Sequence, residues 1–101
     1  MIEDAELDEL RGRIDELDHQ MLSLLKRRAE VVMLVGDLKR EKKLHVYDPK
    51  REEKLLARLS GDASLPLDER AVRSIFAEVV SNCRRLEEVH MQGSSLASKD
   101  S

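Results

Sequence analysis

The sequence predicts an all-α fold: a three-helix protomer with a very long first helix, paired with a second copy in an intertwined homodimer. Charged residues make up 39% of the 101 residues and aromatic residues only 2%, whereas sheet proteins favour aromatic and β-branched residues. Apolar residues also recur at alternating spacings of three and four from Leu7 to Leu38. This spacing is typical of one continuous helix that packs against other helices.

The first helix is expected to begin with Asp4 as its N-cap and to run to about Lys42. Its apolar stripe consists of Leu7, Leu10, Ile14, Leu17, Met21, Leu24, Val31, Val35 and Leu38. At 1.5 Å per residue this helix is roughly 57 Å long, while a compact domain of this size is about 35 Å across. The excess length is either an extension exposed to solvent or is covered by a second copy. The unbroken stripe favours the second copy.

One position in the apolar stripe carries a cation, Arg28, in place of an aliphatic side chain. An unpaired buried charge is costly, so either an acid from another helix or a bound anion must pair with Arg28. Arg11 and Lys39 each directly follow a stripe residue and flank the same face. Lys39 comes eleven residues after Arg28, which is about three helical turns, so the two cations project from nearly the same side.

The second helix is expected to follow a short link, Leu44–Tyr47. Asp48 can serve as its N-cap and Pro49 as its first residue, because proline has no N–H and a preset φ. We expect the helix to stop at Gly61, since glycine accepts the left-handed conformation that often ends a helix.

The third helix is expected to open with Asp68 as its N-cap. Its apolar stripe consists of Val72, Phe76, Val79, Cys83 and Leu86, and Glu87 borders that stripe. Residues 1–92 are expected to form one domain. Residues 93–101 are small and polar, and we expect them to form a flexible C-terminal tail.

Composition excludes several classes of function. The formal net charge is −3 and no basic arm offsets it, so a general nucleic-acid binder is not expected. No apolar run is long enough to span a bilayer, so no membrane association is expected. The single cysteine, Cys83, fits a reducing compartment, and we expect a cytoplasmic protein. The three histidines, His19, His45 and His90, lack the spacing of a metal site.

Taken one at a time, the polar candidates have ordinary structural roles, such as a helix cap or a first-turn charge. Their combination is more specific, because several cations can converge with two or three acids between aliphatic walls. No nucleophile with an adjacent base and no glycine-rich phosphate loop is present. Such a site suits a small polyanion, and an enzyme built on it would act by positioning and charge stabilisation.

The chain to about Glu88 resembles the all-helical (AroQ-class) chorismate mutases. The resemblance rests on Leu10-Arg11, Ile14-Asp15-Glu16-Leu17-Asp18, Leu24-Leu25 with Arg27-Arg28, Val35-Gly36 before Lys39, and Ile75-Phe76-Ala77-Glu78-Val79. The most specific match is Val46-Tyr47-Asp48-Pro49-Lys50-Arg51-Glu52. The resemblance implies conversion of chorismate to prephenate without a cofactor or metal. It also implies a homodimer with two identical sites, each completed by the partner's long helix.

Four cations carry the site that the resemblance implies. Arg11 from the partner and Arg28 would hold the two substrate carboxylates. Lys39 would contact a carboxylate and the ether oxygen whose bond breaks, and Arg51 would add positive field. On this reading the substrate is the anion that Arg28 requires.

Two acids, Asp48 and Glu52, would meet the ring hydroxyl of chorismate. Two further positions depart from the best-known pattern of the family. Cys83 stands where a serine hydroxyl often assists a carboxylate, and a thiol is a weaker donor. Glu87 stands where a glutamine commonly donates to the ether oxygen. A carboxyl group donates only when protonated, so we expect activity to be highest at acidic pH.

Two alternatives remain beside the mutase. An isochorismate–pyruvate lyase shares this fold and a similar set of cations, but Asp48 and Glu52 suit the ring hydroxyl of chorismate better. The chain could instead be a non-catalytic helical dimerisation module. Such a module would have no reason to keep Arg28 in its apolar stripe beside Lys39 and Glu87.

Overall fold

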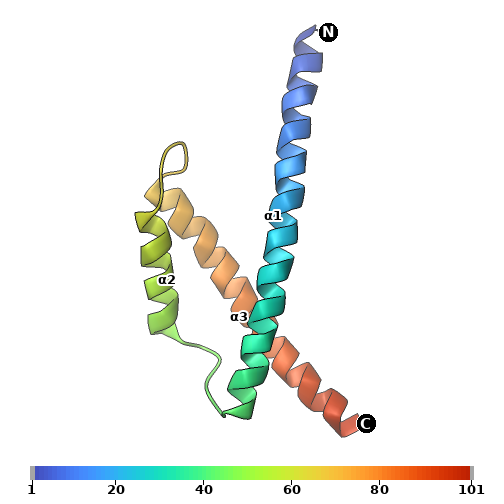
Figure 1. The fold of residues 1–101 in the computed structure, drawn as a ribbon, viewed down its shortest axis with the longest axis vertical. Helices are drawn as coiled ribbons and strands as arrows, with labels where there is room; N and C mark the ends of the chain where they lie inside the picture. The colour runs from blue at the N-terminus through green and yellow to red at the C-terminus, as the bar shows by residue number, and fades with distance from the viewer. Residues whose placement is uncertain (1, 101) are drawn as a thin grey trace.

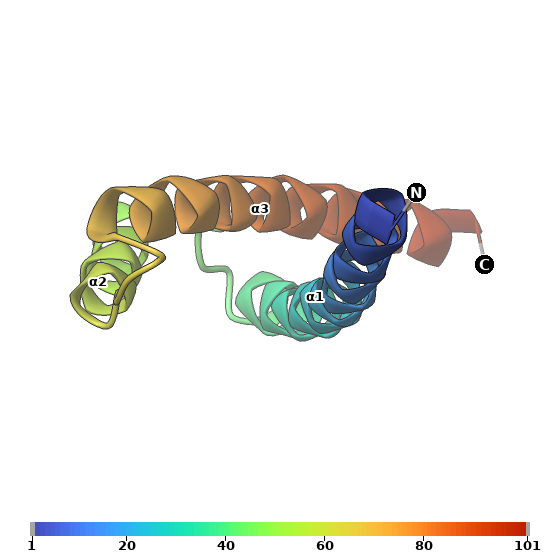
Figure 2. The ribbon, with the colours of Figure 1, turned by 90° about the horizontal axis from the view of Figure 1, so that it is seen from above.

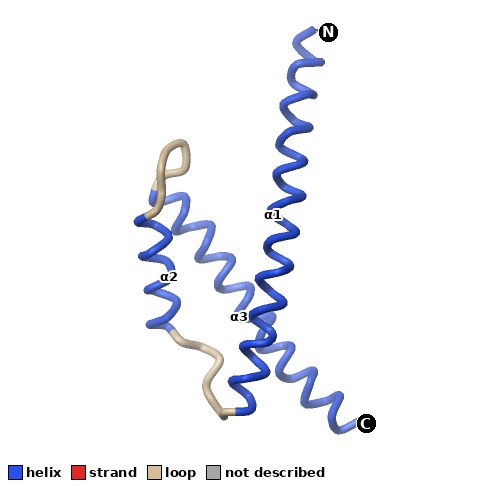
Figure 3. Tube along the Cα trace, in the orientation of Figure 1, coloured by secondary structure: helices blue, strands red, loops and turns tan. Residues whose placement is uncertain are grey.

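The computed structural model describes the backbone of residues 2–100 and the side chains of residues 4–93. It consists of three helices joined by two loops: α1 (Ile2–Glu41), α2 (Pro49–Gly61) and α3 (Glu69–Asp100) (Figure 1, Figure 3). The all-α prediction and the very long first helix are confirmed. The predicted N-cap of the first helix is wrong, because α1 already begins at Ile2 and Asp4 lies inside it.

Helix α3 is the element that holds the protomer together, since it packs against both α1 and α2. Seen from above, α2 lies beneath one end of α3, and the C-terminal part of α1 lies beneath α3 farther along (Figure 2). Among the described residues, helices α1 and α2 do not pack against each other. The N-terminal part of α1 rises beyond the other two helices (Figure 1). A long segment of α1 therefore lies outside the three-helix region.

The crossing of α1 and α3 depends on Gly36, which is buried. A Cβ atom at this position would lie 2.9 Å from Cγ of Glu87 and 3.3 Å from Cγ of Met91. Nearby, Nε2 of His90 lies 2.8 Å from Oδ1 of Asp37, which ties the same two helices together. Only a residue without a side chain allows the side chains of Glu87 and Met91 to lie this close to the backbone of α1.

Residues 42–48 join the C-terminal end of α1 to the N-terminal end of α2, and we call them the α1–α2 connector. Helix α1 ends in a Schellman arrangement: the N–H of Leu44 donates to the carbonyl of Lys39 at 2.7 Å and the N–H of Lys43 to that of Arg40 at 3.2 Å. Lys43 supplies the left-handed residue, with φ of 59°, a position that glycine usually fills.

The predicted caps of α2 and α3 are confirmed. The N–H of Arg51 donates to Oδ1 of Asp48 at 3.1 Å, and the N–H of Ala71 donates to Oδ1 of Asp68 at 2.8 Å. The prediction that α2 stops at Gly61 is confirmed. The left-handed conformation expected there is wrong, because no glycine in the described part of the chain has a positive φ. Instead α2 closes with a bond from the N–H of Asp62 to the carbonyl of Leu59 at 3.1 Å.

Helix α3 continues to Asp100, so residues 93–100 are helical where composition led us to expect a tail outside the helix. The flexibility of this segment stays a prediction. Met1, Ser101 and the side chains of residues 94–100 lie outside the described part of the chain.

The protomer is extended and has a small core. Its radius of gyration is 18.4 Å, against about 13 Å for a compact domain of this length. Among the described side chains, the buried apolar ones are Leu55, Val72, Val80 and Cys83. By contrast, the apolar stripe is between 52% and 58% exposed at Leu10, Ile14, Leu17, Met21 and Leu24. No helix in the described residues is both long and apolar enough to cross a membrane.

Gly36→Ala is expected to destabilise the protein. The new methyl group would lie too close to Cγ of Glu87 and must displace that side chain or the helix that carries it. Overpacking of this kind typically costs about 1–3 kcal/mol, more than the gain in helix propensity of up to about 1 kcal/mol. Urea unfolding followed by circular dichroism measures the change. Gly12→Ala is the matched control, since nothing lies within 4 Å of its Cβ position, and it should stabilise the protein slightly. Equal effects of the two substitutions would contradict a tight crossing at Gly36.

Candidate active site

A pocket of about 190 Å³ opens between α1, the α1–α2 connector, α2 and α3. Its aliphatic walls are Val32, Val35, Val46, Leu55 and Val80. Seven of the eight site residues predicted from the sequence line it: Arg28, Lys39, Asp48, Arg51, Glu52, Cys83 and Glu87. The fold thus gathers residues that are up to 59 positions apart, since 87 − 28 = 59, around one space of small-molecule size.

Arg28 enters the pocket from α1 and is half-buried. Its Nη1 atom is buried and has no hydrogen-bond partner. Of the two partners that the sequence allowed, an acid from another helix is not present among the described residues of the chain. The pocket therefore contains a buried guanidinium N–H that a bound anion would satisfy.

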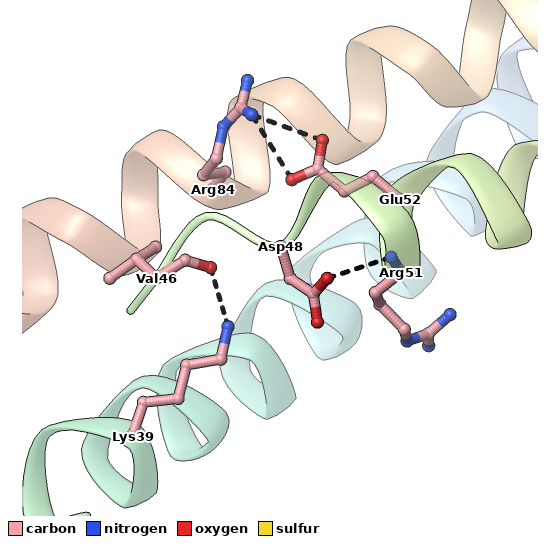
Figure 4. Close-up of polar contacts among 6 residues, drawn as sticks. All are labelled: Lys39, Val46, Asp48, Arg51, Glu52 and Arg84. Atoms are coloured by element: carbon pink, nitrogen blue, oxygen red, sulfur yellow. Dashed lines mark hydrogen bonds and ion pairs between the residues drawn. The ribbon is translucent and has the colours of Figure 1, made fainter. Parts of the chain in front are cut away.

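Lys39 enters the pocket from the last turn of α1. Its Nζ donates to the carbonyl of Val46 at 2.8 Å, as Figure 4 shows, and lies 3.2 Å from Oε2 of Glu87. That contact is close enough for an ion pair, yet Oε2 is buried without a hydrogen bond. Lys39 and Glu87 therefore form an ion pair without a hydrogen bond.

Glu87 and Cys83 face the pocket from consecutive turns of α3. Both are buried, with 6% and 7% of their surfaces exposed. Glu87 was expected at the edge of the apolar stripe, and burial beside Lys39 makes it part of the pocket wall. Cys83 is a free thiol and fills the space between Glu87 and the aliphatic wall residue Val80 on the same helix face.

The first turn of α2 supplies three polar side chains. Asp48 caps the helix through Oδ1, and Figure 4 shows its carboxylate beside the N-terminus of α2. Arg51 extends away from Glu52 and Arg84 in the same view. Glu52 points toward α3, where its oxygens lie 3.3 and 3.4 Å from Nη1 of Arg84.

Arg84 is the charged pocket residue that sequence reasoning missed. It lies on α3, lines the pocket, pairs with Glu52 and places its guanidinium carbon 4.3 Å from the centre of the Tyr47 ring. The spacing of residues along α3 could have predicted that Arg84 faces the pocket. Arg84 comes four residues after Val80 and three before Glu87, and residues at these spacings share a helix face.

Arg11 is the one predicted site residue that the structure does not bring to the pocket. Its side chain is 65% exposed in the N-terminal part of α1, and its Nη1 lies 4.0 Å from Oδ1 of Asp8 on the same helix. The uncovered apolar stripe runs along the same part of α1. Arg11 therefore does not line the pocket of its own chain, and its role in the site of a partner stays a prediction.

The charges of the pocket favour a small anion. Its lining contains four cations (Arg28, Lys39, Arg51 and Arg84) and three acids (Asp48, Glu52 and Glu87). Lys39 and Arg84 are already paired with acids, while the buried Nη1 of Arg28 is not. In the described part of the chain no group of three or more His, Cys, Asp or Glu residues is placed to hold a metal ion.

Two solved structures have the same arrangement of helices. Chorismate mutase (Form II) from Thermus thermophilus is 35% identical, with a TM-score of 0.79 over 82% of this chain and 94% of that one. Chorismate mutase from Helicobacter pylori, in complex with prephenate, is 31% identical, with a TM-score of 0.80 over 87% and 96% of the two chains.

Sequence relatives are longer proteins. The chain is 33% identical over 86 residues to a bifunctional chorismate mutase/prephenate dehydratase of Aquifex aeolicus, and 36% identical over 85 residues to that of Neisseria gonorrhoeae. These matches cover 81% and 80% of this chain but 24% and 23% of the relatives, so the chain spans about a quarter of their length. Residues 10–88 match the family described as Chorismate mutase type II. The chain therefore belongs to the type II chorismate mutase family.

Proposed function

We propose that this protein is a chorismate mutase, which rearranges chorismate to prephenate within one molecule and without a cofactor. The observation that carries the proposal is the buried, unpartnered Nη1 of Arg28 in a pocket lined by three further cations. Membership of the type II family supports it, as does the structural similarity to a chorismate mutase with bound prephenate. The proposal places the enzyme in aromatic amino acid biosynthesis in the cytoplasm.

The pocket geometry fits the chemistry of this rearrangement. Chorismate must leave an extended shape for a compact one, and fixing both of its carboxylates selects the compact shape. When the C–O bond breaks, partial negative charge develops on the ether oxygen. Lys39 is held in place by the carbonyl of Val46, so its ammonium group is preorganised to stabilise that charge more strongly in the transition state than in the substrate.

We further propose that the working unit is an intertwined homodimer in which the partner's Arg11 completes each site. The exposed apolar stripe of α1 and the four-residue apolar core support a second copy, because soluble monomers rarely expose a contiguous apolar surface of this length. Arg11 lies on the same uncovered part of α1. A copy that covers the stripe would therefore bring its own Arg11 toward the neighbouring pocket.

The direct test of the reaction is loss of chorismate absorbance on addition of the protein, with prephenate identified as the product. Isochorismate should be assayed in parallel, with pyruvate as the product measured. Formation of pyruvate from isochorismate without prephenate from chorismate would make the protein a lyase. No turnover of either substrate would favour a dimerisation module.

Arg28→Leu should leave the free energy of unfolding unchanged or raise it while activity collapses. Leucine completes the apolar stripe and removes a buried charge that lacks a protein partner, whereas the complex loses a partner for a substrate carboxylate. A fall in kcat/KM of roughly 30-fold or more is expected. Thermal melts and steady-state kinetics on the same preparation measure both effects. A large loss of stability would show that Arg28 is paired within the folded protein.

Mixing Arg11→Ala with Arg28→Ala chains tests the shared site. Each variant alone should be inactive. A heterodimer places the intact Arg28 of one chain beside the intact Arg11 of the other, so one of its two sites works. After random subunit exchange, activity should recover to about a quarter of the parent value, because half of the dimers are mixed. Absence of recovery, with exchange verified by mass spectrometry, would contradict the partner's contribution.

Glu87→Gln tests whether Glu87 donates to the ether oxygen. An ionised carboxylate only accepts hydrogen bonds, and it would also repel the charge that develops on that oxygen. Glutamine is a permanent donor of nearly the same shape, so the kcat/KM of the Glu87→Gln variant, measured from about pH 5 to pH 8.5, should depend on pH less than that of the parent. Glu87→Ala should be poor throughout. Parallel pH profiles of parent and Glu87→Gln would exclude Glu87 as the donor.

A further inference from the structure

We propose that Arg84 is a positioning residue that holds Glu52 and the α1–α2 connector in the arrangement that recognises the ring hydroxyl of the substrate. This inference rests on the proposed function and assigns a role to the one charged pocket residue that the reaction chemistry above leaves unused. Arg84 acts through Glu52 and Tyr47, and it does not itself need to touch the substrate.

The contact between Arg84 and Glu52 joins α3 to the first turn of α2 (Figure 4). Nη1 of Arg84 lies 3.3 and 3.4 Å from the two carboxylate oxygens of Glu52. The two side chains are 28% and 23% exposed, so solvent screens this pair less than a pair on the open surface. Arg84 therefore restricts the direction of the Glu52 carboxylate before a ligand arrives.

The second contact of Arg84 reaches the α1–α2 connector. Its guanidinium carbon lies 4.3 Å from the centre of the Tyr47 ring, a cation–π distance. Tyr47 stands between Val46, which accepts from Lys39 of α1, and Asp48, which caps α2. Three successive connector residues are thus tied to the three helices in turn. We call Arg84, Tyr47 and Glu52 the connector clamp.

The connector clamp also affects which cations of the pocket are free to bind the substrate. Glu52 shares the pocket with Arg28, whose Nη1 has no partner in the free protein. A mobile Glu52 carboxylate would be drawn toward the cations that the substrate carboxylates need. By holding Glu52 at α3, Arg84 keeps those cations available and leaves a fixed acceptor for a hydroxyl group.

The chain contains a matched control for this inference. Arg73 of α3 pairs with Glu53 of α2 at 2.8 Å, so it joins the same two helices through the same chemical groups. That pair is more exposed, at 46% and 62%, and neither residue lines the pocket. If Arg84 merely tied α2 to α3, its loss would resemble the loss of Arg73.

The kinetic test compares Arg84→Ala with Arg73→Ala. A hydroxyl contact is made in both the bound substrate and the transition state, so its loss raises KM and leaves kcat nearly unchanged. Misplacement of Glu52 should raise KM for chorismate on the order of ten- to a hundredfold, while Arg73→Ala stays within about twofold. The penalty of Arg84→Ala should shrink toward that of the control with a chorismate analogue that lacks the ring hydroxyl.

Conservative variants show whether a rise in KM comes from lost positioning or from a folding defect. Arg84→Lys keeps the charge but loses the planar guanidinium that both pairs and stacks, so KM should rise less than in Arg84→Ala. Tyr47→Phe keeps the ring face and should match the parent, whereas Tyr47→Leu should raise KM. Thermal melts of all variants separate these effects from loss of folded protein.

An independent readout does not require activity. Tyr47 is the only tyrosine and the chain has no tryptophan, so tyrosine emission reports on the connector alone. Time-resolved anisotropy should acquire a larger fast component in Arg84→Ala, because the ring loses its guanidinium partner, and should be unchanged in Arg73→Ala.

The outcomes separate this inference from the proposed function. Equal KM values for Arg84→Ala and Arg73→Ala in an active parent, or an unchanged anisotropy decay in Arg84→Ala, would overturn the role of Arg84. A parent that does not convert chorismate would overturn the proposed function and the hydroxyl role of Glu52, while the anisotropy decay would still decide whether Arg84 holds the connector.

Discussion

The close approach of α1 and α3 at Gly36 is the constraint on which the pocket depends. Because Gly36 has no side chain, the side chain of Glu87 from α3 lies against the backbone of α1, within ion-pair distance of Lys39. Asp37 and His90 join the same helices one residue away. The N-terminal part of α3 then diverges from α1 and packs against α2 (Figure 1). Residues of all three helices line the pocket.

Some charged groups of the pocket are paired with other residues of the chain, and one buried group is left without a partner. Lys39 and Arg84 are held by Val46, Glu87, Glu52 and Tyr47, and these contacts fix the α1–α2 connector over the site. Nη1 of Arg28 is buried without a partner. A folded protein that keeps such a group accepts a cost in stability, and binding of an anion would offset that cost.

A single protomer buries little of its apolar surface. Its core is limited to a few side chains around α3, while the apolar stripe of α1 stays exposed over most of its length. The same geometry separates Arg11 from the pocket of its own chain. The exposure of the apolar stripe and the separation of Arg11 from the pocket of its own chain thus have one common cause, the length of α1 beyond the three-helix region (Figure 1).

The sequence by itself determined the helices and their caps at Asp48 and Asp68, because periodicity and capping are local properties. Seven residues of the pocket were predicted through the resemblance to a known family, since their motifs can be read along the chain. Sequence reasoning misplaced the start of α1 and the conformation of Gly61, since helix ends depend on weak local preferences. Only the tertiary structure decided that Arg84 pairs with Glu52, that Tyr47 stacks on Arg84 and that Gly36 abuts Glu87. These contacts join residues of different helices, and the crossing angle that brings them together is set by packing across the whole protomer.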